Sequence, residues 1–346
     1  MGPQLRGNSV SPIPIQKAMN KLHLFGLAIA LTGCIEHELP IPAREPGDAL
    51  IRYADLGSDY NVQLHVQLHT GEIMASHPKD AWCTRFHFDE DTIWMDLNGS
   101  RFMHIAAMSQ AMADGPLSQE ESDDLPWGVN RPEGRDTSQV VRVGSTWAID
   151  LGRDPANPIA SLGSVRLECL SMESEEVMLR VSDLVTDQPE ALSWDTIWVT
   201  HDQNVSQTHL SLLNREVVDI EPPTGTWELY FTQYTTLFET EDGEPLEYLV
   251  TGVLSHAEGV RVLQPEDGDW EYWKEVEWNS EDWSEDWDVL GWDWKSYSLS
   301  DGSYTINSDQ IYCIATSEGR EFLLRFLDFY DETGATGRVT YETLER

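Results

Sequence analysis

The segment between residues 266 and 294 holds the densest group of side chains that could contact a ligand. It contains seven tryptophans and twelve acidic residues against a single lysine, Lys274. Indole rings stack on flat or sugar-like molecules, and a rim of carboxylates favours neutral or cationic ones. The segment therefore predicts a ligand-facing loop, with Trp270 and Trp273 as candidate contacts. The alternative is a covering loop whose tryptophans anchor it to a sheet through their apolar area.

Histidines form the second group with chemical potential, but their spacing does not indicate a metal centre. His65 and His69 are four residues apart in an alternating strand pattern, and four strand residues span about 13 Å, too far for one metal ion. We interpret them as solvent-facing strand residues. The remaining candidate ligand-binding histidines are His201, His209 and His256, for which surface or turn positions are the alternative. No metal site is predicted.

Catalytic signatures are missing from the sequence. The H-E-x-x-H, Walker, Rossmann and G-x-S-x-G motifs do not occur, and acidic residues are too abundant for one acid/base pair to be singled out. We therefore expect a protein that is not an enzyme. No C-x-x-C motif occurs, which argues against a zinc ribbon or a thioredoxin-type site. Cys83, Cys169 and Cys313 allow either one disulfide or three buried thiols.

Net charge limits the class of partner. The 346 residues include 61 Asp and Glu against 22 Lys and Arg, a formal net charge of −39. Nucleic acid is excluded as a partner, because neutralising phosphates requires clustered basic side chains. With 40% hydrophobic residues the chain nevertheless has enough apolar material to fold. The acid excess is most simply explained by solubility in an ionic exterior.

The N-terminal region has the pattern of a bacterial lipoprotein signal. Lys21 precedes an apolar run of about ten residues, too short for a bilayer-spanning helix. The run ends in Leu-Thr-Gly-Cys34, which resembles a lipobox, so Cys34 is the predicted lipidation site and membrane contact. The alternative is an ordinary secretion signal. We expect residues 1–33 to be an upstream extension and signal peptide, residues 34–55 to be the anchor and tether, and the protein to lie on the outer membrane, exposed at the surface.

Almost all of the remaining sequence has strand patterns. Residues 61–69 alternate apolar and polar side chains, which is the period of a half-buried strand. Comparable patterns predict an N-terminal β half at 56–187 and a C-terminal β region at 188–346. The last three strands, at 310–317, 321–330 and 337–344, are joined by short polar turns and predict an antiparallel meander. The expected fold class is all-β.

Several of these stretches resemble the HmuY-like family of haem-binding bacterial surface lipoproteins. The resemblance is carried by residues 216–234 and 248–254, by Gly-Ser-Tyr-Thr-Ile at 302–306, and by 319–330 and 337–342. It is strongest from about 208 to 346 and looser from 56 to 207, and the lipobox agrees with it. The resemblance implies a fold of two antiparallel sheets that holds one ligand between loops at one end.

In the best-known members that ligand is haem, held by two axial His or, in some relatives, Met. Here no His or Met follows His256. The positions nearest the family's ligands carry Tyr297 and Tyr272, and Tyr can bind haem iron. Our first hypothesis is therefore capture of haem or another flat small ligand. The alternative is a surface glycan- or protein-interaction lipoprotein that has lost the haem site.

Overall fold

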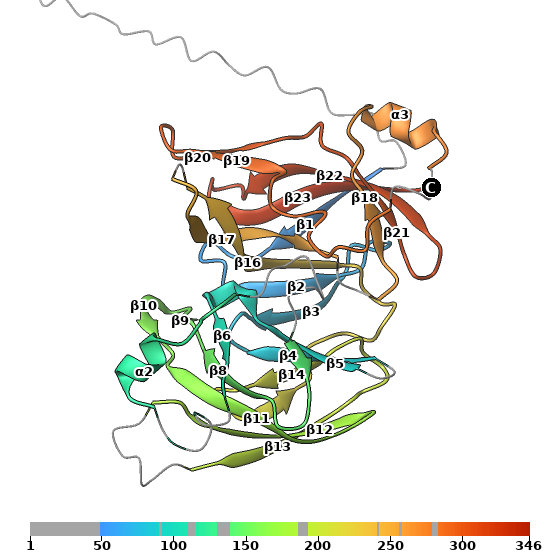
Figure 1. Cartoon of the computed structure of the whole chain (residues 1–346). Helices are drawn as coiled ribbons and strands as arrows, with labels where there is room; N and C mark the ends of the chain where they lie inside the picture. The colour runs from blue at the N-terminus through green and yellow to red at the C-terminus, as the bar shows by residue number, and fades with distance from the viewer. Residues whose placement is uncertain are drawn as a thin grey trace, which may run out of the picture. The chain divides into compact units, whose positions relative to one another are not determined.

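The computed structural model describes residues 49–346 apart from 90–91, 110–111, 113–114, 116, 130–138, 186–192, 241, 256–257 and 279–282. Within these residues the regular structure is overwhelmingly strand (Figure 1), and the named strands pair antiparallel. The all-β prediction is confirmed. The predicted lipidation site Cys34 and the candidate His256 lie outside the described residues. No helix of the described part has the length and apolar character to cross a membrane.

Two sheets enclose the first hydrophobic core, and we call this pair the first sandwich. One sheet has the order β1-β23-β22-β21-β18, and the other has the order β17-β16-β2-β3. Phe231 of one sheet contacts Tyr341 of the other across the core, with ring centroids 5.4 Å apart. The strands of the first sheet are β1 (Leu50–Asp55), β18 (Arg261–Leu263), β21 (Tyr312–Ala315), β22 (Glu321–Tyr330) and β23 (Thr336–Glu345). Those of the second are β2 (Val62–Val66), β3 (Ile73–Pro78), β16 (Leu229–Glu239) and β17 (Pro245–Leu254).

Two further sheets enclose a second core and form the second sandwich. Their orders are β15-β14-β4-β5-β7 and β13-β12-β11-β8-β6, and apolar residues of both sheets share one buried cluster. The first of these sheets contains β4 (Thr84–Asp89), β5 (Thr92–Leu97), β7 (Gln139–Val141), β14 (Thr208–Ser211) and β15 (Glu216–Val218). The second contains β6 (His104–Ala107), β8 (Thr146–Asp150), β11 (Ser164–Glu173), β12 (Glu176–Asp183) and β13 (Asp195–Thr200).

The order of strands along the chain is nested. The chain begins the first sandwich with β1 to β3, builds the second with β4 to β15, and returns to the first with β16 to β23. The sheets therefore combine residues 50–78 with 229–345, a grouping that differs from the predicted regions 56–187 and 188–346. The structure also has four large sheets where two were expected. The predicted C-terminal meander is present as β21, β22 and β23.

Short elements outside the sandwiches place several candidate residues. Helix α3 (Trp270–Glu275) begins where the Asp269 side chain accepts a hydrogen bond from the Tyr272 backbone N–H, at 2.8 Å. Beyond it, β19 (Lys295–Ser298) and β20 (Ser303–Ile306) form a separate hairpin. A 3-10 turn, η1 (Gly99–Arg101), a helix α2 (Gln119–Asp123) and a hairpin of β9 (Arg153–Asp154) and β10 (Asn157–Ser161) complete the described elements.

Cys83, Cys169 and Cys313 are free and buried. Burial raises the pKa of Cys169 to about 11 and that of Cys313 to about 12. Of the two alternatives that the sequence left open, the structure has buried thiols, which pack as small apolar side chains. The raised pKa values leave Cys169 and Cys313 with little thiolate character.

Candidate functional site

Part of the tryptophan-rich segment forms an open groove beside α3. Residues 263–268 line one side of it, Tyr272 and Trp273 line the other, and its volume is about 690 Å³. A groove of this size is in the range of small-molecule sites in proteins. The segment that was predicted to face a ligand therefore contains a groove, and this groove lies beside a short helix that the sequence pattern did not reveal.

Local contacts fix the orientation of the two aromatic rings. The Trp273 indole N–H donates to the Asp267 carbonyl oxygen at 2.8 Å. Gly268 has a φ of +99°, and a Cβ at this position would lie 2.6 Å from the Trp273 indole nitrogen, so only glycine lets the loop close over that ring. Tyr272 stands perpendicular to Trp273, with centroids 5.4 Å apart, and is 54% exposed. The groove thus presents one fixed indole and one accessible phenol.

Trp270 belongs to a different environment from Trp273. It is 7% exposed and packs in a small apolar cluster against the first sandwich. The Arg325 guanidinium lies over its ring, 4.5 Å from the centroid, which is a cation–π arrangement. Trp270 therefore anchors α3 to the sheet, as the covering-loop alternative expects, whereas Trp273 lines the groove.

The charge around the groove is negative. Glu266, Asp267 and Glu271 are exposed beside it, and the nearby Lys274 pairs with Glu271, with 3.2 Å between Nζ and Oε2. Because this pair is on the surface, it contributes little to stability, but it leaves no uncompensated cation in α3. The groove therefore favours a neutral or cationic ligand over an anion.

Tyr297 lies on the β19–β20 hairpin, away from the groove. Its ring packs on that of Tyr304 at 4.9 Å, and the Tyr304 backbone N–H donates to the Tyr330 hydroxyl at 2.6 Å. The hairpin is thus fixed near Tyr330, whereas α3 packs near Arg325, five residues back along β22 (Figure 1). Five strand residues span about 16 Å. The structure does not bring Tyr272 and Tyr297 together as a pair of axial ligands.

The first residue of that hairpin, Lys295, is a buried cation that sequence reasoning missed. Its Nζ donates to the carbonyl oxygens of Thr251 and Trp292 and lies 4.1 Å from the centroid of the Trp294 ring. Burial lowers the pKa of Lys295 to about 7. The sequence signal was the position of this lysine within an aromatic and acidic run, which gave no sign that it points inward.

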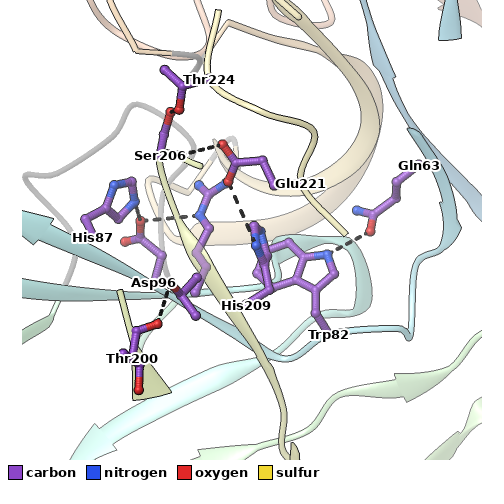
Figure 2. Close-up of polar contacts among 11 residues, drawn as sticks. Gln63, Trp82, His87, Asp96, Thr200, Ser206, His209, Glu221 and Thr224 are labelled. Carbon is purple, nitrogen blue, oxygen red and sulfur yellow. Dashed lines mark hydrogen bonds and ion pairs between the residues drawn. The ribbon is translucent and has the colours of Figure 1, made fainter. Parts of the chain in front are cut away.

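His209 lies among the buried polar residues that Figure 2 shows. Its ring meets the Trp82 ring edge-on at 4.9 Å, and its Nδ1 lies 4.0 Å from Oε2 of Glu221. Burial, aided by the Arg85 charge, lowers the pKa of His209 well below its usual value, and burial raises the pKa of Glu221 to about 8. The two groups therefore meet as a neutral pair at neutral pH, and His209 is an interior residue.

The same network contains an arginine and a carboxylate. Arg85 Nε lies 3.5 Å from Asp96 Oδ2, and His87 Nε2 lies 3.1 Å from the same oxygen. The Arg85 guanidinium also lies 4.6 Å from the centroid of the Trp287 ring. Arg85 and Asp96 line a cavity of about 40 Å³. A cavity of this size has room for water but not for an organic ligand.

The other predicted histidines are dispersed. His201 is half-buried and stacks on Phe88 at 5.0 Å. The solvent-facing interpretation holds for His69, which is exposed beside Glu345, but it is wrong for His65, which is 1% exposed and packs 4.5 Å from the Trp227 ring. The reason is that β2 is covered on both faces, whereas an alternating pattern is normally taken to mean one solvated face. In the described residues, no three His, Cys, Asp or Glu side chains are arranged to hold a metal ion.

Comparison with known proteins adds distant structural likenesses. No family model and no curated protein matches the chain. Apo PinO from Porphyromonas gingivitis matches 86% of this chain and 97% of its own, with 9% identity and a TM-score of 0.32. The apo HmuY analog of Tannerella forsythia matches 45% of this chain and 85% of its own, with 8% identity and a TM-score of 0.23. At these values no site or ligand can be transferred, so the proposals below depend on this chain's own residues.

Proposed function

We propose that the protein is a lipid-anchored, extracytoplasmic binding protein that holds a sugar-like, neutral or cationic ligand in the groove beside α3. The observation that supports this most directly is the pairing of a fixed Trp273 ring with an exposed Tyr272 ring along a groove of about 690 Å³. Sugar rings present C–H faces that stack on indole and phenol rings, and their hydroxyls can bond to the carboxylates nearby. The lipid anchor is inferred from the lipobox at Cys34.

Haem suits this groove less well than a sugar does. Its propionates would meet the carboxylates of Glu266 and Asp267, and the groove offers Tyr272 as its conventional iron ligand while Tyr297 lies on a separate hairpin. A flat neutral ring avoids this repulsion and needs no axial ligand. Haemin is therefore included in the test as the competing ligand.

The test is a glycan array followed by titration calorimetry of the full chain with each glycan that binds. We expect Trp273→Ala and Tyr272→Ala each to weaken binding about tenfold, the equivalent of about 1.4 kcal/mol. Trp198→Ala is the matched control, because Trp198 is an exposed tryptophan on β13 of the other sandwich. Array binding that survives both groove substitutions would contradict the proposal. So would a haemin Soret shift that Tyr272→Phe abolishes.

A further inference from the structure

The outer edge of β17 is open along half of its length. β17 is the last strand of its sheet and pairs with β16 on one side. On the other side the Val253 N–H donates to the Gly291 carbonyl oxygen at 2.9 Å, and Lys295 donates to the Thr251 carbonyl oxygen. This coverage needs a glycine at 252, where a Cβ would lie 2.5 Å from the Gly291 oxygen.

The cover ends at Thr251. Because backbone groups alternate in direction along a strand, Leu249 and Glu247 point their N–H and C=O groups to the same side as Val253. Among the residues that the structure describes, neither Leu249 nor Glu247 has a backbone partner on that side. Unpaired groups of this kind are a template for a further strand.

Apolar side chains surround this open edge. Leu246 and Tyr248 of β17 are 50% and 55% exposed, and Leu299, which follows β19, is 92% exposed. The β19–β20 hairpin lies next to β17 (Figure 1). Burial, together with the nearby hydroxyls of Tyr248, Tyr297 and other tyrosines, raises the pKa of Tyr304 to about 12, so these rings share one neighbourhood. Edges of soluble proteins are usually protected by lysines, by prolines or by a covering segment. Pro245 protects only the first position of this strand, and among the described residues no lysine or covering segment protects Glu247 or Leu249.

The charge at this edge is acidic. Residues 229–254 contain no Lys or Arg, while Glu239, Asp242 and Glu244 are exposed at the end of the β16–β17 hairpin and Asp301 is exposed on the neighbouring hairpin. Pairing with a second copy of this chain would oppose these carboxylates to one another, which is unfavourable. A strand that carries Lys or Arg would instead pair with them.

We propose that the first half of β17 is a docking edge for an extended, cationic segment of a partner protein. The segment adds as a strand beside Glu247 and Leu249, its backbone bonds to the outward N–H and C=O groups, and its basic side chains lie by the acidic residues of the hairpin. Alternate apolar side chains of the segment lie over Leu246, Tyr248 and Tyr297. Backbone bonds give affinity in this mode of recognition, and side chains give specificity.

The probe is a short fluorescent peptide in which Lys alternates with Val, measured by anisotropy against the full chain. The matched variants are Leu249→Ala, which shortens the side chain and keeps the outward N–H, and Leu249→Pro, which removes that N–H where the fold does not use it. We expect the peptide to bind the unaltered chain and Leu249→Ala, and to bind Leu249→Pro about tenfold more weakly. Equal binding to the two variants would overturn the proposal.

Two further measurements test strand addition even if the Leu249→Pro variant does not fold. A peptide N-methylated along one edge must bind the unaltered chain much more weakly, because it retains the charge and loses the backbone donors. Glu239→Lys with Glu244→Lys must also weaken binding, while Glu173→Lys with Glu175→Lys, on the β11–β12 turn of the other sandwich, must not. Full binding of the N-methylated peptide would reduce the interaction to charge alone and overturn strand addition. A dimer of the full chain that Leu249→Pro dissolves would assign the edge to a second copy.

Discussion

Lys295 provides the sharpest test of the structure, because the sign of its effect on stability should depend on pH. The perturbation is Lys295→Met, which keeps a long flexible side chain on the Trp294 ring and removes the charge and the donor. Burial lowers the pKa of Lys295 from 10.5 to about 7. Lys295 therefore loses its proton at a much lower pH in the folded protein than in the unfolded chain.

The sign and size of the effect follow from linkage. Because the unfolded chain binds more protons between pH 7 and 10.5, the free energy of unfolding rises with pH across this window. At about 1.4 kcal/mol for each pKa unit, the cost of the buried charge is on the order of 5 kcal/mol below pH 7 and about 1 kcal/mol at pH 10. Methionine removes this cost and also removes the bonds to the carbonyls of Thr251 and Trp292, worth about 1 kcal/mol each.

We therefore expect Lys295→Met to raise the free energy of unfolding by about 3 kcal/mol at pH 6 and to lower it by about 1 kcal/mol at pH 10. The assay is urea denaturation of both proteins, followed by tryptophan fluorescence, at pH values from 6 to 10. Tyrosine ionisation affects both proteins and cancels in the difference, and Lys274→Met controls for the loss of a lysine from the half-exposed surface of α3. A difference between Lys295→Met and the unaltered chain that stays constant with pH would refute the assignment of Lys295 as a buried, readily neutralised amine.

Two further predictions concern the buried network and the groove. Burial raises the pKa of Glu221 to about 8, so the free energy of unfolding of the unaltered chain should fall as pH rises from 4.5 to 8, because a buried carboxylate must then form. Glu221→Gln stays neutral, so this variant should be about as stable as the unaltered chain at pH 5 and more stable than it at pH 8. Chemical denaturation at the two pH values checks this, and a Gln variant less stable at pH 8 would contradict it. Gly268→Ala should cost about 1–2 kcal/mol in strain and displace the Trp273 ring, measured as a lower melting temperature and weaker glycan binding. Gly144→Ala is its control, because it has φ +84° and open space around the added methyl; equal binding losses in the two variants would count against the Trp273 explanation.

Local patterns in the sequence were sufficient to predict the C-terminal meander. Its three apolar runs are separated by turns that carry glycines and polar residues, so the prediction of β21 to β23 depended on neighbouring residues alone. Burial alternates only in the first half of β23, whereas β21 and the first part of β22 are buried on both faces. The nested arrangement did not follow from such patterns. The pairing of Leu64 with Phe231 joins residues far apart in the chain, and periodicity indicates that a strand forms without indicating its partner.

The sequence indicated which segment could contact a ligand, but it did not predict the groove or the helix that form there. Helix α3 is six residues long, too short for a helical period to emerge. Trp270 and Trp273 are of the same type and lie one turn apart, and the contact that separates their roles, Arg325 over Trp270, comes from a distant strand. The same limitation explains the wrong prediction for His65. Its side chain is buried by Trp227 and Tyr230, which come from a distant part of the sequence.

The distribution of basic residues gives the acid excess a more specific meaning. Six Lys and Arg side chains are buried among the described residues, out of 22 in the chain, whereas five buried Asp and Glu come from a total of 61. Several of these cations lie against aromatic rings, as Arg85, Lys295 and Arg325 do. A larger share of the basic than of the acidic side chains is therefore buried. The surface consequently has a larger excess of negative charge than the composition alone indicates. The groove beside α3 and the open edge of β17 both belong to this anionic surface, so each should select against anions by long-range repulsion before any contact is made.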